Sequence, residues 1–166
     1  PDFTFFQSQP ACYAAVERID PPLFERIRQY VKQGRWELGG GMWTEGDTNL
    51  ASGEALCRSF LLGQRYFMKK FGKISKMGWL PDNFGHASQL PQILKLSGCQ
   101  TYYFHRCRPF LGTFWWEGPD GSKVLCFSNH TYNGRLSKGV SNEIDEMGKQ
   151  TGRALHICGV GDHGGG

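Results

Sequence analysis

Short apolar segments alternate with amphipathic segments along most of the chain, and this alternation restricts the possible folds more than any other feature. The apolar segments have the length and composition of buried strands, whereas the amphipathic ones have helical periodicity. The predicted strands are Phe3–Gln7, Trp36–Met42, Lys76–Leu80, Thr101–His105 and Ala154–Val160. Because strands joined through helices of this length form parallel βαβ units, the sequence predicts an α/β fold.

Capping residues mark the ends of the predicted helices. Asp20 is an N-cap residue that precedes two prolines, which the first turn of a helix tolerates. Ser52 is a second N-cap, and glycines follow the last apolar positions of both helices. The expected helices run from Pro21 to Gly34, from Ser52 to Gly72, from Ser88 to Leu96 and from Ser141 to Thr151.

The alternation changes after the fourth predicted strand. Thr113–Glu117 and Lys123–Ser128 flank a Pro-Asp-Gly turn, a pattern typical of a β-hairpin. The expected architecture is therefore an open parallel sheet or an incomplete, barrel-like (βα) domain with an inserted hairpin. In such folds the loops after the strands carry function. Those loops are Gly39–Asn49, Pro81–Ser88, His105–Pro109 and Gly159–Gly166.

Composition excludes several classes of protein. Hydrophobic residues make up 39% of the chain and charged residues 20%, which is too few charges for a disordered tail. The 19 basic residues are scattered, so no basic face for nucleic acid is expected. No apolar run is long enough to span a bilayer. The six cysteines include no C-x-x-C pair and mostly have apolar neighbours, so we interpret them as buried free thiols in a reducing compartment.

Asp82 is the first candidate for chemistry, because it follows the third predicted strand in the segment Trp79–His86. A carboxylate at the end of a parallel strand suits a nucleophile or a ligand of a hard metal. An Asx turn, in which Asp82 only caps its own loop, explains the position equally well. His86 is a second candidate ligand, although a hydrogen-bonded structural histidine is the more common outcome.

Other strand ends carry further candidates. Arg106 follows the fourth strand, where a guanidinium can hold and orient a neighbouring carboxylate, or simply lie at the surface. Asp162 and His163 lie in a glycine-rich segment that lacks the lysine of a phosphate loop, so they suit an acid/base role, a binding contact or a plain turn. Trp43, Trp115 and Trp116 are candidate sugar platforms, with core packing as the alternative. In a strand Trp115 and Trp116 point to opposite faces, so one of the two is expected in the core.

Several long motifs resemble those of one family and follow one another in the same order and spacing. The segment Trp79–His86, followed by Leu90–Leu94, is similar to the nucleophile segment of glycoside hydrolase family 38, the α-mannosidases. Phe6–Pro10 and Gly34–Trp43 are also similar to segments of that family, and the hairpin at Thr113–Ser122 and Gly161–Gly166 resemble its cytosolic and bacterial branch in particular. The resemblance extends over essentially the whole chain, so residues 1–166 are identified as part of an α-mannosidase catalytic domain.

The resemblance implies retaining hydrolysis of terminal α-mannosides through a covalent mannosyl-enzyme intermediate. Asp82 corresponds to the nucleophile, which in this family is also a ligand of a zinc ion, and Arg106 to a residue that supports it. Asp162 is the candidate general acid, and Trp43, Arg106, Trp116 and His163 are candidate substrate-binding residues. The implied partner is a mannose-containing oligosaccharide or glycan, the implied location is the cytoplasm, and a homo-oligomeric parent is left open.

One departure from the family pattern limits these expectations. The family supplies two metal ligands from a His-x-Asp motif on its first strand, and no His-x-Asp occurs in this sequence. We therefore expect the chain to lack that strand and the C-terminal domains, and to be inactive by itself. The alternatives are a non-catalytic carbohydrate-binding fragment and another sugar-processing α/β hydrolase, such as a polysaccharide deacetylase. The latter is disfavoured because no His-x-x-x-His is present.

Overall fold

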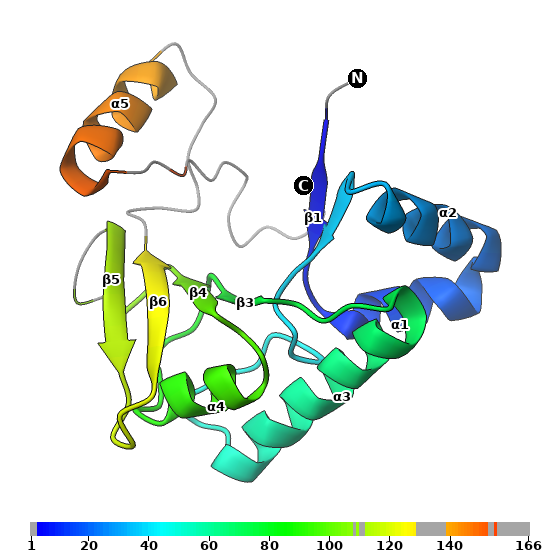
Figure 1. The fold of residues 1–166 in the computed structure, drawn as a ribbon, viewed down its shortest axis with the longest axis horizontal. Helices are drawn as coiled ribbons and strands as arrows, with labels where there is room; N and C mark the ends of the chain where they lie inside the picture. Colours follow the sequence, from blue (N-terminus) through cyan, green and yellow to red (C-terminus); the bar gives the residue numbers. More distant parts are fainter. Residues whose placement is uncertain (1–2, 108, 110–111, 129–138, 153–154, 156–166) are drawn as a thin grey trace.

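The computed structural model describes residues 3–107, 109, 112–128, 139–152 and 155, which form two sheets and five helices (Figure 1). The strands are β1 (Phe5–Gln7), β2 (Trp36–Leu38), β3 (Met77–Leu80), β4 (Thr101–Phe104), β5 (Gly112–Glu117) and β6 (Lys123–Ser128). The helices are α1 (Pro10–Ile19), α2 (Pro21–Lys32), α3 (Gly53–Phe71), α4 (Leu90–Leu96) and α5 (Val140–Thr151).

The two sheets have mostly parallel strands. In the smaller sheet β1 pairs with β2, and Phe6 lies opposite Glu37. The larger sheet has the order β3-β4-β6-β5, in which β3, β4 and β6 are parallel and only β5 is antiparallel. The predicted hairpin is thus not a separate insertion, because its second strand joins the parallel sheet and its first strand forms the edge.

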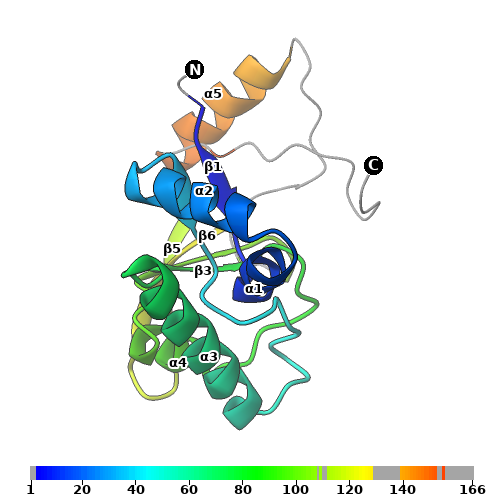
Figure 2. The same cartoon turned by 90° about the vertical axis from the view of Figure 1, so that its right-hand side faces the viewer.

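A separate hydrophobic core lies behind each sheet. Helices α3 and α4 cover one face of the larger sheet (Figures 1 and 2). Phe60, Leu94 and Tyr102 of this core are almost completely buried. Helices α1 and α2 pack with β2 around Tyr13 and Phe67. Because α3 contributes residues to both cores, it holds the two sheets in one unit. Helix α5 lies beyond the end at which β5 begins (Figure 1).

The predicted helix boundaries are confirmed where a capping side chain defines them. Asp20 accepts a hydrogen bond from the Leu23 N–H at 3.0 Å, and Ser52 accepts one from the Ala55 N–H at 3.2 Å. Gly72 ends α3 with a φ of 70°, a conformation that favours glycine. Helix α1 was not predicted from the sequence. Its N-cap residue, Gln9, has a φ of 59° and makes no capping side-chain hydrogen bond, so only Pro10 in the first turn marks where the helix starts.

Three other expectations have different outcomes. Cys99 and Cys126 are buried free thiols as expected, but Cys12, Cys57 and Cys107 are exposed, so local apolar neighbours were a poor guide to burial. The predicted strand Ala154–Val160 lies outside the described residues, apart from Leu155. Among the helices that the structure describes, none combines the length and apolar character needed to cross a bilayer.

Candidate active site

The loops that follow β2 and β3 are joined by a buried threonine. Thr48 has no exposed surface, and its hydroxyl donates to the Gly85 carbonyl at 3.1 Å. The side-chain amide of Asn83 lies 3.4 Å from the same hydroxyl, as does His86 Nδ1. Because an unpaired buried hydroxyl is costly, these contacts fix the two loops against each other.

His86 links this junction to β4. Its Nδ1 lies 3.0 Å from the Tyr102 hydroxyl, and its Nε2 lies 3.3 Å from the Arg106 carbonyl oxygen. Burial lowers the pKa of His86, although the Arg106 carbonyl partly opposes that shift. A neutral ring that donates from Nε2 and accepts at Nδ1 satisfies both contacts. His86 is therefore placed as a structural hydrogen-bonding residue, the alternative that the sequence favoured over a metal ligand.

The structure brings Asp82 and Arg106 together. The Arg106 guanidinium forms an ion pair with the Asp82 carboxylate, and both side chains are partly exposed. The guanidinium also lies over the Phe84 ring, 4.6 Å from its centroid. Phe84 itself is exposed, so the pair and the ring form an accessible group just beyond the ends of β3 and β4. This arrangement can hold a carboxylate in one orientation toward a bound molecule.

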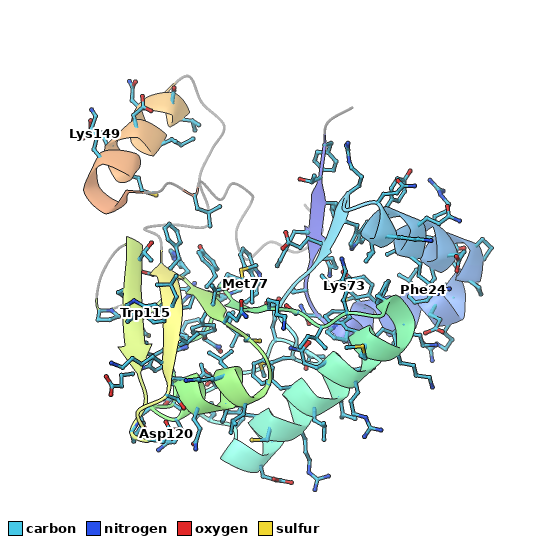
Figure 3. All side chains as sticks on the ribbon, viewed as in Figure 1. Phe24, Lys73, Met77, Trp115, Asp120 and Lys149 are labelled. Atoms are coloured by element: carbon cyan, nitrogen blue, oxygen red, sulfur yellow. The ribbon has the colours of Figure 1, made fainter. Side chains whose placement is uncertain are left out.

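The three predicted sugar platforms have different surroundings. Trp43 is half-buried, and its ring meets Tyr66 of α3 edge-on with centroids 5.7 Å apart. Trp116 packs against the core of the larger sheet, with His86 and Phe104 as ring neighbours. Trp115, which is labelled on β5 in Figure 3, has 65% of its surface exposed. The position of Trp116 therefore favours core packing, the alternative left open above, over stacking on a sugar.

Glu45 belongs to the same region and was not singled out from the sequence. Its carboxyl group accepts a hydrogen bond from the Ser8 hydroxyl, although the two residues are 37 positions apart. Ser8 directly follows β1, and Glu45 lies in the loop after β2. No local spacing pattern reveals such a contact, because it depends on how β1 and β2 pair.

The remaining candidates do not complete a metal site. Asp162 and His163 lie outside the described residues. Within the described part of the chain, no three His, Cys, Asp or Glu side chains are grouped so that they can hold a metal ion. Asp82 forms an ion pair with Arg106 and would provide a single carboxylate ligand. A catalytic zinc usually has three protein ligands. The described residues therefore do not fit a zinc ion by themselves.

Comparison with known proteins gives a consistent result. Residues 1–166 match the model of the glycosyl hydrolases family 38 N-terminal domain. The chain is 38% identical over its full length to human alpha-mannosidase 2C1, and 35% identical to an alpha-mannosidase of Saccharomyces cerevisiae. It covers 17% and 16% of these two relatives. A crystal structure of an alpha-mannosidase from Enterococcus faecalis aligns with 96% of the chain and 20% of its own length, with a TM-score of 0.77 and 25% identity.

Proposed function

The chain belongs to glycosyl hydrolase family 38, and we propose that the full-length protein is a retaining α-mannosidase that acts on terminal α-mannosides of an oligosaccharide or glycan. The observation that carries this proposal is the Asp82–Arg106 pair beyond the ends of β3 and β4. The family relation supplies the chemistry, and the pair supplies a carboxylate that is accessible and oriented.

In the proposed reaction the Asp82 carboxylate attacks the anomeric carbon of the mannoside. The bond from that carbon to the leaving-group oxygen breaks, and the departing oxygen receives a proton from a second carboxylic acid. Water then attacks the mannosyl ester, gives its proton to the second carboxylate and releases Asp82. Arg106 keeps Asp82 oriented during both steps. Asp162 is our candidate for the second carboxyl group, which in retaining enzymes lies about 5–5.5 Å from the nucleophile.

Several finer features belong to the same proposal. We infer that the two sheets form part of one barrel-like (βα) domain, since the loops after β2 and β3 are hydrogen bonded to each other. Zinc is proposed as the cofactor from the family relation, with Asp82 as one ligand and the others outside the described residues. A cytoplasmic location and substrate contacts from Trp43, Arg106 and His163 stay predictions. A contact from Trp116 was predicted with them, but its packing against the core disfavours that role.

A product analysis with the full-length protein tests the proposal. The protein is incubated with an aryl α-mannoside, and the anomer released first is followed by NMR, with the matching aryl α-glucoside as the control substrate. We expect α-mannose as the first product and little release from the glucoside. β-Mannose as the first product contradicts retention. Glycan binding without turnover contradicts the enzyme proposal and supports a carbohydrate-binding protein.

The isolated chain of 166 residues provides a second, independent test. We expect no measurable turnover and weak zinc binding, because the described residues supply only one carboxylate of a possible metal site. The measurements are an aryl-mannoside assay and an isothermal titration with zinc. Tight one-to-one binding together with turnover contradicts this expectation and places the full ligand set within the chain.

A further inference from the structure

We propose that Glu45 and Ser8 form a second sugar-contact point, at which the carboxyl group of Glu45 binds hydroxyl groups of the mannose-containing substrate. This inference rests on the proposed function and deepens it, because it names substrate-binding residues for which neither the family relation nor the sequence motifs provided a role. The observation behind it is a carboxyl–hydroxyl pair that joins the residue after β1 to the loop after β2.

The backbone next to Ser8 and next to Glu45 positions the two side chains of the pair. Ser8 is 7% exposed and lies one residue beyond β1, where its hydroxyl donates to the Glu45 carboxyl group. The next residue, Gln9, has a φ of 59°, an uncommon conformation for a residue with a side chain. Its side-chain oxygen lies 3.4 Å from the Glu45 N–H. Conformations of this kind concentrate at functional sites, where the surrounding structure maintains them.

The loop that carries Glu45 is anchored on both sides of it. On one side, the Trp43 N–H donates to the Ser59 carbonyl at 3.0 Å, and the Trp43 carbonyl accepts from the Ala11 N–H at 3.0 Å. On the other side, Thr48 joins the loop that contains Asp82. Three residues of chain span at most about 11 Å, so the backbone of Glu45 lies within that distance of Thr48, which makes the junction with the Asp82 loop.

Glu45 has no evident structural task that requires its charge. The turn that follows is capped by Asp47 instead, which accepts from the N–H groups of Asn49 and Leu50 at 2.8 and 3.0 Å. In the described part of the chain, no Lys or Arg forms an ion pair with Glu45. Burial raises the pKa of Glu45, and the hydrogen bonds from Ser8 and Gln9 only partly offset this. A half-buried carboxyl group without a cation is costly, which favours a role in binding.

The chemistry of the pair suits a sugar. A carboxylate accepts hydrogen bonds, and a carboxylic acid both donates and accepts, so either form can bind a hydroxyl group. The Ser8 hydroxyl can accept a further bond while it donates to Glu45. A pyranose presents neighbouring hydroxyl groups that each donate and accept, and it needs no charged partner. An anionic ligand fits poorly, because the pair contains an acid and no cation.

The test uses the full-length protein with Glu45→Gln, Ser8→Ala and Ser8→Thr, and Glu25→Gln as a matched control. Glu25 is exposed on α2 and pairs only with Arg28 of the same helix among the described ion pairs. KM and kcat are measured with an α-mannoside, and mannose binding is measured by isothermal titration calorimetry. Thermal unfolding of each variant is recorded alongside.

We expect Glu45→Gln and Ser8→Ala to raise KM about tenfold or more, as the loss of a hydrogen bond to a charged or strongly polar group does, with a smaller change in kcat. Ser8→Thr keeps the hydroxyl and should restore most of the affinity, and Glu25→Gln should match the wild type. Lower melting temperatures with unchanged KM and unchanged mannose affinity would show a purely structural pair and overturn the inference.

The titration separates this inference from the proposed function. If the wild type binds mannose but releases none from any α-mannoside, the proposed reaction fails, while weaker binding by Glu45→Gln still supports the contact point. If the wild type is active and Ser8→Ala, which changes only one small side chain, leaves KM and mannose affinity unchanged, the contact point is wrong and the reaction stands.

Discussion

Two carboxyl groups lie beyond strand ends in this domain, and their surroundings are opposite in kind. Asp82 is partly exposed and ion-paired with Arg106, whereas Glu45 is half-buried and hydrogen bonded to the neutral Ser8. Burial without a cation raises the pKa of the Glu45 carboxyl group, which the hydrogen bonds from Ser8 and Gln9 only partly oppose. The contrast matches the two roles that we propose, attack on the sugar by the ion-paired Asp82 and sugar binding by the hydrogen-bonded Glu45.

Of the substitutions considered, removal of the Asp82 carboxylate should lower kcat the most, and it tests the role of the ion-paired carboxyl group. We expect Asp82→Ala to lower kcat of the full-length protein on the order of 10⁴-fold or more, since no glycosyl ester can form. Asp120→Ala is the control, because Asp120 lies exposed in the turn between β5 and β6 (Figure 3). Activity above a few per cent of wild type would exclude Asp82 as the nucleophile.

The next largest effect identifies the proton donor. We expect Asp162→Asn to slow release of a poor leaving group by about 10²–10⁴-fold and to change release of an activated aryl group far less, because an activated group departs without a proton. Both substrates are assayed in parallel with Glu45→Gln. If Glu45→Gln shows this dependence on the leaving group and Asp162→Asn does not, the roles of the two residues are reversed.

Arg106→Ala should have a smaller effect, since the guanidinium orients Asp82 and takes no part in bond formation. We expect kcat to fall by about 10²-fold, the cost typical of a misplaced catalytic group, and Arg106→Lys to recover part of it. The measurement is kcat on the same aryl mannoside. A loss equal to that of Asp82→Ala would mean that Arg106 acts directly on the substrate.

The smallest effect concerns His86, which lies between the two loops and β4. Because its pKa is lowered in the folded state, its contribution to stability is complete above the usual histidine pKa of about 6.5 and is lost as the pH falls below that value. Thermal unfolding at pH 7.5 and 5.5 should therefore show less pH dependence in His86→Gln than in the wild type. Equal pH dependence would exclude His86 as the titrating group.

Sequence reasoning succeeded where one residue dictates local geometry. Asp20, Ser52 and Gly72 act through the adjacent backbone, so their positions predicted the helix ends. The meeting of Asp82 and Arg106 followed from their places after neighbouring parallel strands. In the same way, strand alternation correctly separated Trp115 from Trp116, although it did not reveal which one is packed.

The features that were missed depend on contacts between distant segments. Ser8 and Glu45 meet only because β1 pairs with β2, and Thr48 reaches Gly85 across 37 positions. Helix α1 starts after a residue with positive φ, for which the sequence has no local signal at Gln9. Whether the two sheets close into a barrel depends on strand pairing, which the apolar pattern of the individual strands does not specify.

The central claim, that Asp82 is the nucleophile of a retaining α-mannosidase, is tested most directly by trapping the intermediate. The full-length protein is incubated with a fluorinated mannosyl fluoride, which forms the glycosyl ester faster than water removes it, and its peptides are analysed by mass spectrometry. The account predicts one mannosyl group on the Asp82 side chain and no label in Asp82→Ala. A label on another carboxylate, or the same label in Asp82→Ala, would contradict it.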